Sequence, residues 1–327
     1  MKRLIILVVA VIAATVLIAV FNDELVSINP IKFVNNLLYG AKTPSAAPRS
    51  PASPARSVPP KSGQAQAHKK LVLATWNLRM LSSNSRSDED IAKICEILAR
   101  FDLVAMQEVL DMRVLDRCRE TMAAKGLERA YLLSTAVGTS THKEHYAFFY
   151  DPAVVSPDGK ADVVADPGDR FIREPYHCSF QSGNFDFTLI TVHILYGSGK
   201  KDPKRLAELD AIADVFNAIQ AEDPKENDVI LTGDFNEEPN SPRFHSLGSI
   251  PTISFLVMKV KTVIFDSSIY DQIIWQKQYT GYEYTGDWEV VKFDEEMFGN
   301  KDEVASAAVS DHRPVWASFN TDEQDDD

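Results

Sequence analysis

Short apolar stretches recur along most of the chain and give the first indication of its secondary structure. Seven of them are four to seven residues long and rich in β-branched or aromatic side chains, which is typical of buried β-strands. They are residues 71–76, 103–106, 146–150, 187–192, 229–232, 269–275 and 315–319.

Helical spacing appears between several of these stretches. Ser87 precedes three acidic residues, which is a helix-start signal, and apolar residues then recur at Ile91, Ile94 and Leu98. The same spacing predicts helices around 112–122 and 206–219. Strands interleaved with helices predict an α/β domain of about 250 residues, in which helices cover the sheets.

The N-terminus has a different pattern. Lys2 and Arg3 precede an unbroken apolar run over residues 4–21, which as a helix would be roughly 27 Å long and would just span a bilayer. The basic pair would keep the N-terminus in the cytoplasm. No small-x-small cleavage site follows, so an uncleaved membrane anchor is favoured. A cleaved signal and a buried core helix remain alternatives.

Composition divides the rest of the chain into a linker, a folded part and a tail. Residues 22–70 form a predicted linker, whose second half (41–70) has six prolines, six basic residues and no acidic ones. Residues 71–320 form the predicted folded domain, and 321–327 an acidic tail. With the anchor preceding it, we expect the domain in the periplasm or outside the cell, or secreted if the segment is cleaved.

The charge is unevenly distributed. Residues 1–70 carry nine basic and two acidic side chains, whereas 71–327 carry 25 basic and 45 acidic ones. So acidic a domain cannot hold nucleic acid by bulk charge, and would need metal ions and local arginines to act on a polyanion. Three cysteines do not make a disulfide scaffold.

Polar side chains with reactive or ligating atoms stand at the ends of six predicted strands. One such residue would usually be a turn residue that bonds to its own backbone. Polar residues at six separate strand ends indicate a site that combines cation ligands with acid and base groups. The residues are Asn77, Glu108, His193, Asp234 with Asn236, Asp271, and Asp311 with His312.

The motifs around these residues resemble the endonuclease/exonuclease/phosphatase superfamily, and within it the deoxyribonuclease I type. They occur in family order as WNLRM, QEV, KEHYAFFYDP, FIREP, TVH, GDFNEEPNS, YDQI and SDHRPV. GDFN followed much later by SDH-x-PV is the most specific pair. The resemblance implies a four-layer sandwich of two mostly antiparallel β-sheets flanked by helices.

The resemblance also implies roles for individual residues. Glu108 would be the main Mg²⁺ ligand, with Asn77 and Asp311 completing the oxygen set. His193 and His312 would flank the scissile phosphate as acid and base, and Glu144 and Asp271 would orient them. Asp234 and Asn236 would position water and the phosphoryl group. The expected substrate contacts are Arg79, Arg173, Arg113 and Tyr270, with Arg113 substituting for an arginine that the family has where this chain has Leu110.

The activity that follows from the resemblance is that of a Mg²⁺-dependent phosphodiesterase, an endonuclease that cuts DNA to 3′-hydroxyl and 5′-phosphate ends. Mn²⁺ could replace Mg²⁺, and the resemblance leaves open whether the chain binds Ca²⁺. One alternative keeps the chemistry and changes the substrate to a phospholipid, as in sphingomyelinases, or another phosphate ester. A second is a tethered binding module without catalysis. The expected partners are the substrate and a lipid bilayer, with no protein partner.

Overall fold

A computed structural model describes residues 69–197, 202–222 and 227–323. The predicted anchor or signal, residues 1–21, lies outside the described residues, as do the predicted linker up to residue 68 and tail residues 324–327. Within the described ranges, no helix is both long and apolar enough to cross a membrane. The folded part begins with a strand at Lys70, one residue before its predicted start.

Two mixed β-sheets form the centre of the described structure. The first has the order β12 (Tyr284–Val290), β13 (Val315–Asn320), β1 (Lys70–Leu81), β2 (Leu103–Val109), β5 (Lys143–Tyr150) and β3 (Ala130–Leu133), and β4 (Val137–Gly138) also pairs with β5. The second has the order β10 (Ile253–Phe255), β11 (Asp271–Gln276), β9 (Val229–Asp234), β8 (Phe185–His193), β7 (Tyr176–Ser182) and β6 (Ser156–Val163).

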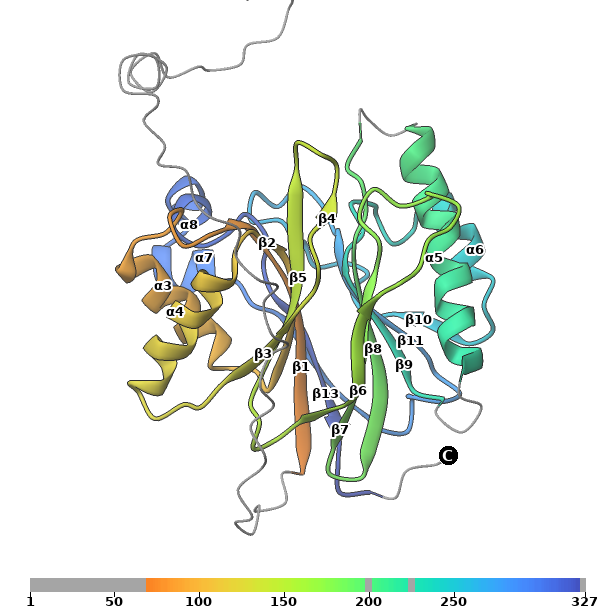
Figure 1. The fold of residues 1–327 in the computed structure, drawn as a ribbon, viewed down its shortest axis with the longest axis horizontal. Helices are drawn as coiled ribbons and strands as arrows, with labels where there is room; N and C mark the ends of the chain where they lie inside the picture. The colour runs from red at the N-terminus through yellow and green to blue at the C-terminus, as the bar shows by residue number, and fades with distance from the viewer. Residues whose placement is uncertain (1–68, 198–201, 223–226, 324–327) are drawn as a thin grey trace, which may run out of the picture. The chain divides into compact units, whose positions relative to one another are not determined.

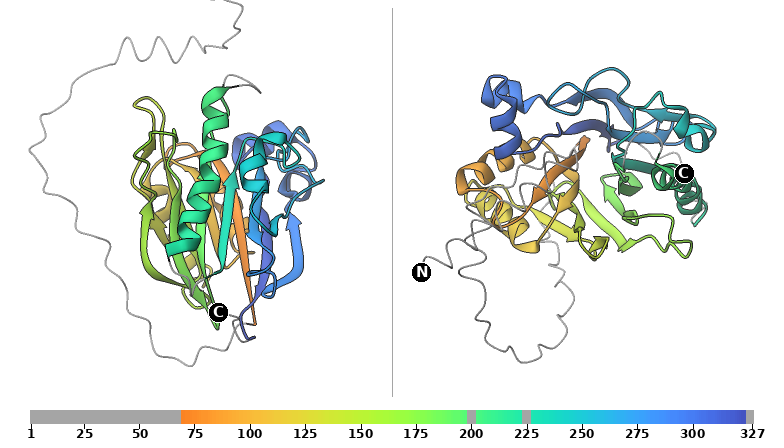
Figure 2. Two further views of the ribbon diagram at one scale, coloured as in Figure 1. Left: turned by 90° about the vertical axis from the view of Figure 1, so that its right-hand side faces the viewer. Right: turned by 90° about the horizontal axis from the view of Figure 1, so that it is seen from above.

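Helices cover the outer face of each sheet, which makes four layers (Figure 1). Beside the first sheet lie α3 (Asp88–Leu98), α4 (Met112–Ala123), α7 (Phe293–Phe298) and α8 (Asp302–Ala308). Beside the second lie α5 (Pro203–Glu222) and the short α6 (His245–Gly248), which follows a 3-10 turn (Pro242–Phe244). Figure 2 shows the same layers from the side and from above. The expected four-layer sandwich is therefore confirmed.

Three apolar clusters hold these layers together. One lies between the sheets and is rich in aromatic rings, including Phe148, Phe180 and Phe187. A second joins the first sheet to α3 and α4, and a third joins the second sheet to α5. Strands buried on both faces carry nearly continuous apolar runs, which is why the central strands were visible in the sequence.

All seven predicted strands and all three predicted helices are present. The helix that the Ser87 signal predicted begins at Asp88, and Ser87 and Asp90 bond to each other's backbone as a capping box. The sequence did not reveal the two-residue β4, the strand β7, the less buried strands β3, β6, β10 and β12, or helices α6, α7 and α8. In β6 and β12 most side chains are exposed or half-buried, so neither has a continuous apolar run.

Parallel pairing at the centre of each sheet brings the site residues together. β1 is parallel to β2, and β8 is parallel to β9, so the C-terminal ends of each pair lie at one edge. β11 runs antiparallel to β9 and starts at that edge, where Asp271 pairs with Asp234. Asp234 in turn pairs with His193 on β8.

Candidate active site

Asp234, at the end of β9, is the centre of the site. Its carboxylate is buried and accepts hydrogen bonds from Asn77 Nδ2 (3.0 Å) and from the backbone N–H of Asn236 (2.9 Å). Burial by itself would raise the pKa of Asp234, but the neighbouring His312 and His193 outweigh it and lower that pKa. A permanent negative charge therefore sits between the two histidines.

Gly233 allows Asp234 to reach this position. It has a φ of +135°, and a Cβ at this residue would lie 2.0 Å from the backbone oxygen of Val192 on β8. Only glycine allows so close an approach of the two strands. The glycine of the GDFN motif therefore has a steric role, which is to bring Asp234 beside His193.

His193 is paired with a carboxylate from the other sheet. Its Nδ1 lies 2.8 Å from Glu144 Oε1, and its Nε2 lies 3.6 Å from Asp234 Oδ2. Burial alone would lower the pKa of His193, but the charge and hydrogen bond of Glu144, together with the charge of Asp234, outweigh burial, so the pKa is raised. The hydrogen bond to Glu144 fixes the tautomer and directs Nε2 towards Asp234.

His312 has the matching arrangement on the opposite side. Its Nδ1 lies 2.9 Å from Asp271 Oδ2, and its Nε2 lies 3.8 Å from Asp234 Oδ2. Burial opposes protonation, yet the carboxylates of Asp271 and Asp234 raise the pKa of His312 to about 10. His312 is therefore protonated at neutral pH. The pKa of His193 is also raised, by Glu144 and Asp234, but the neighbouring Arg173 opposes this rise.

The residues predicted as metal ligands lie on the first-sheet side of Asp234. Glu108 Oε1 accepts from Asn77 Nδ2 (3.0 Å), and Glu108 Oε2 accepts from the backbone N–H of Met80 (2.8 Å). Asn77 Oδ1 accepts from the backbone N–H of Arg79. In this arrangement Asn77 holds the carboxylates of Glu108 and Asp234 in place, and the Glu108 side chain remains partly exposed.

A group of three residues also has the composition of a metal site. Asp234, Asp271 and His312 offer ligand atoms that all lie within 4.8 Å of one another. Asp271 already bonds to His312 Nδ1, so this trio is also a hydrogen-bonded acid–base pair beside a carboxylate. The acidic site as a whole could hold a divalent cation.

Left-handed backbone conformations concentrate at the site. Arg79, Met80, Glu108 and Asn236 have φ between +44° and +59° although none is glycine. Such conformations cost about 1–3 kcal/mol each and are typical of functional sites. Arg86 supports one of these loops, because its guanidinium donates to the backbone oxygens of Leu78 and Arg79.

The four arginine and tyrosine residues predicted to bind substrate differ in position. Arg79 donates to Ser306 and lies 3.7 Å from Asp311, at the edge of the site. Arg173 lies behind His193, whose backbone oxygen it contacts at 3.0 Å, and 3.7 Å from Glu144. Arg173 therefore holds the His193–Glu144 pair in place, and its contact with a phosphate stays a prediction.

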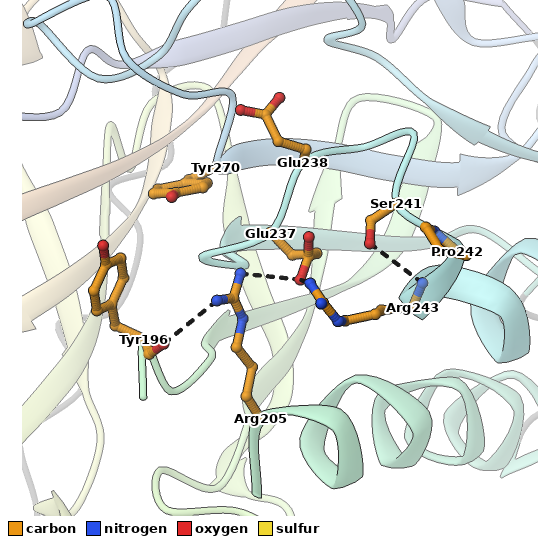
Figure 3. A pocket seen from close by; sticks show the side chains of 8 residues that line it. All are labelled: Tyr196, Arg205, Glu237, Glu238, Ser241, Pro242, Arg243 and Tyr270. Atoms are coloured by element: carbon orange, nitrogen blue, oxygen red, sulfur yellow. Dashed lines mark hydrogen bonds and ion pairs between the residues drawn. The ribbon is translucent and has the colours of Figure 1, made fainter. Parts of the chain in front are cut away.

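Arg113 and Tyr270 also remain predictions as substrate contacts. Arg113 is exposed at the start of α4, and within the described ranges no hydrogen bond joins it to the residues around Asp234. Tyr270 is half-buried, and it lines a pocket next to the site (Figure 3). Asp311 is one-third exposed, and its place as a metal ligand is likewise untested.

Several supporting residues were missed by sequence reasoning. The Tyr146 hydroxyl accepts from the His193 N–H (2.9 Å), and Ser310 Oγ donates to the Asn77 backbone oxygen (2.6 Å). Glu208 on α5 accepts from the N–H groups of Ile172 and Leu195 and so holds the loop that follows His193. Tyr146 lies in the KEHY motif, which was a usable signal, whereas Glu208 had none.

A family comparison agrees with this geometry. Residues 74–293 match the model of the Endonuclease/Exonuclease/phosphatase family. The chain therefore belongs to that family, and the deoxyribonuclease I likeness that its motifs suggested is confirmed by the relatives below.

A deoxyribonuclease of Thioalkalivibrio sp. (strain K90mix) is 33% identical over 76% of this chain and 71% of its own length. Human Deoxyribonuclease-1 is 28% identical over 75% of this chain and 90% of its own length. The family and these relatives support a hydrolase that acts on phosphodiester bonds.

A solved structure agrees on the fold. D. rerio TDP2, crystallised with a single-strand DNA product, aligns with a TM-score of 0.56 over 77% of this chain and 99% of its own. Its sequence identity is 15%, so this likeness concerns the fold alone.

Proposed function

We propose that the chain is a Mg²⁺-dependent endonuclease that hydrolyses DNA and leaves 3′-hydroxyl and 5′-phosphate ends. The observation that carries the proposal is the position of the two histidines, whose Nε2 atoms lie 3.6 Å and 3.8 Å from the same oxygen of Asp234. Hydrolysis of a phosphodiester needs a proton removed from water and another delivered to the leaving oxygen. Two imidazoles that face one point supply both transfers.

The environments of the two histidines assign their roles. His312, with its pKa raised to about 10, is the proton donor to the leaving oxygen. His193 keeps its Nδ1 proton on Glu144, so its neutral form presents the Nε2 lone pair and accepts a proton from the attacking water. Asp234 and Asn236 orient that water. Each of the two proton transfers contributes a rate factor of about 10²–10⁴.

The oxygen donors on the first-sheet side fit Mg²⁺, which prefers carboxylates and retained waters. Glu108 would hold the ion with Asp311, and Asn77 would orient Glu108 through the hydrogen bond that it donates. When bound, Mg²⁺, or Mn²⁺ in its place, would offset the negative charge of the phosphoryl group. This charge compensation also accounts for how so acidic a domain could act on a polyanion.

A plasmid assay tests the proposal. The full-length protein with Mg²⁺ is expected to convert supercoiled plasmid to the nicked form, and DNA ligase should reseal the nicks because they carry 3′-hydroxyl and 5′-phosphate ends. EDTA and Asp234→Ala should each abolish nicking, whereas Asp287→Ala, at an exposed surface ion pair, should not. Nicking that persists with both EDTA and Asp234→Ala would overturn the proposal.

The same preparation distinguishes the substrate alternatives. Release of phosphocholine from sphingomyelin, or of phosphate from an inositol phosphate, without any action on plasmid or oligonucleotides would mean that the site serves another ester. The deoxyribonuclease relatives favour DNA.

A further inference from the structure

A pocket of about 320 Å³ adjoins the site on the second-sheet side and has no role in the acid–base chemistry (Figure 3). Its walls include Tyr196, Glu237 and Tyr270. Each is a close chain neighbour of a site residue: Tyr196 lies three residues after His193, Glu237 follows Asn236, and Tyr270 precedes Asp271.

Hydrogen bonds connect the chain segments that carry these lining residues to the segments that carry the site residues. The backbone oxygen of Tyr270 accepts from the N–H of Phe235, at 2.8 Å, and Asn236 Nδ2 donates to the backbone oxygen of Ile194, at 2.9 Å. A strand of substrate whose phosphate is held at Asp234 therefore has the pocket as its immediate neighbour on this side.

Two tyrosine rings form one side of the pocket. Tyr196 is 60% exposed, and its ring centroid lies 6.4 Å from that of Tyr270 at an interplanar angle of 67°. A ring so exposed buries little apolar area and adds little to the stability of the fold. The backbone of Tyr196 is nevertheless held in place, because Arg205 Nη1 donates to the Tyr196 backbone oxygen.

The opposite side of the pocket carries two guanidiniums that share one carboxylate. Arg205 and Arg243 both bond to Glu237 Oε2, at 3.0 Å and 2.7 Å. The side chains of Arg205 and Glu237 are more than nine-tenths buried, whereas Arg243 is about one-fifth exposed. The other acidic residue of the lining, Glu238, faces Lys261 at 3.6 Å. One carboxylate between two guanidiniums leaves a site that attracts a phosphate.

We propose, on the basis of the endonuclease function above, that this pocket binds the nucleotide next to the scissile phosphate in an unpaired strand. The base lies against Tyr196 and Tyr270, and the adjoining phosphate lies at Arg243. Bases in a duplex are stacked and present only their edges in the grooves, so a ring-to-ring contact requires an unpaired base. The volume is at the small end of ligand pockets and suits one nucleoside.

Cleavage of labelled oligonucleotides by the full-length protein tests this assignment. The substrates are one single strand, the same strand with abasic sites, and its duplex. The unmodified protein is expected to have its lowest KM on the intact single strand. Tyr196→Ala should raise that KM about 5–150-fold, the usual loss for one stacked base, and should remove the advantage over the abasic strand.

Three further variants separate the base from the phosphate and from general damage. Tyr196→Phe retains the ring and should retain the preference. Arg243→Gln should raise KM on intact and abasic strands alike, because both carry the phosphate. Tyr282→Ala, at a tyrosine that is 68% exposed between β11 and β12, should change neither the KM nor the preference for the intact strand.

The outcomes distinguish this inference from the function on which it rests. The pocket assignment is wrong, and the endonuclease function stands, if the unmodified protein cleaves intact and abasic strands equally. The same holds if Tyr196→Ala leaves the ratio of KM on the abasic strand to KM on the intact strand unchanged. If the unmodified protein cleaves no oligonucleotide and no plasmid with Mg²⁺, both fail.

Discussion

The two sheets have the same strand arrangement and carry different chemistry. In each, a parallel pair lies at the centre, β1 with β2 in one and β9 with β8 in the other. An antiparallel strand adjoins each pair on either side: β13 and β5 in the first sheet, β11 and β7 in the second. In chain order β1, α3 and β2 match β8, α5 and β9, so Glu108 near the end of β2 corresponds to Asp234 at the end of β9.

Neither sheet contains a complete acid–base pair. Glu144 on β5 of the first sheet orients His193 on the second, and Asp271 on β11 of the second sheet orients His312, which precedes β13 of the first. The matched strands supply similar scaffold positions, and packing of the sheets against each other creates both pairs. The comparison therefore indicates that the site exists only in the assembled sandwich.

The largest expected loss of nicking rate comes from replacing either of the two histidines beside Asp234. His193→Ala and His312→Ala should each lower the nicking rate about 10²–10⁴-fold, because each removes one proton transfer. The double variant should be little worse than the more damaging single variant, since the two act on one phosphoryl group. Quantified plasmid nicking, with circular dichroism to verify folding, measures this. A double loss equal to the product of the single losses would show that the two sides work separately.

The free energy of unfolding tests the contact between the His312 loop and the helices of the first sheet. Arg313 is buried and bonds to Asp294 of α7 at 2.8 Å and 2.6 Å, which ties the His312 loop to the helices of the first sheet. Arg313→Met leaves the Asp294 charge buried without its partner and should lower the free energy of unfolding by about 3–5 kcal/mol.

Urea denaturation provides the measurement for Arg313→Met, with Lys292→Met as the control. Lys292 pairs with Glu295 at the surface, so its loss should cost about 0–1 kcal/mol. An equal loss of unfolding free energy in the two variants would mean that Arg313 does not anchor the His312 loop.

The central strands and the residues at their ends could be predicted because both signals are local. Buried strands carry apolar runs, and Asn77, Glu108, His193 and Asp234 follow those runs directly in the sequence. The contacts between sheets depend on strand pairing over long separations, so local signals did not reveal them. The Glu144–His193 and Asp271–His312 pairs were expected only from the family resemblance. Arg173 illustrates this: its sequence context gave no sign that its guanidinium contacts the backbone oxygen of His193.

The carboxylates behind the two histidines provide the subtlest test, because the pairs should control opposite limbs of the pH profile. Glu144→Gln and Asp271→Asn each remove a charged hydrogen bond, worth about 1.5–3 kcal/mol, and should lower kcat/KM about 10–150-fold. Both changes also remove a negative charge that raises the pKa of the neighbouring histidine.

The sign of the pH shift is the same in both variants, but the limb that moves differs. His193 must be neutral to accept a proton, so a lower pKa in Glu144→Gln should move the acid limb of kcat/KM to lower pH. His312 must be protonated to donate, so a lower pKa in Asp271→Asn should move the alkaline limb down from about pH 10. Profiles at saturating Mg²⁺ measure both limbs. If Asp271→Asn moved the acid limb and Glu144→Gln the alkaline one, the assignment of acid and base to the two sheets would have to be exchanged.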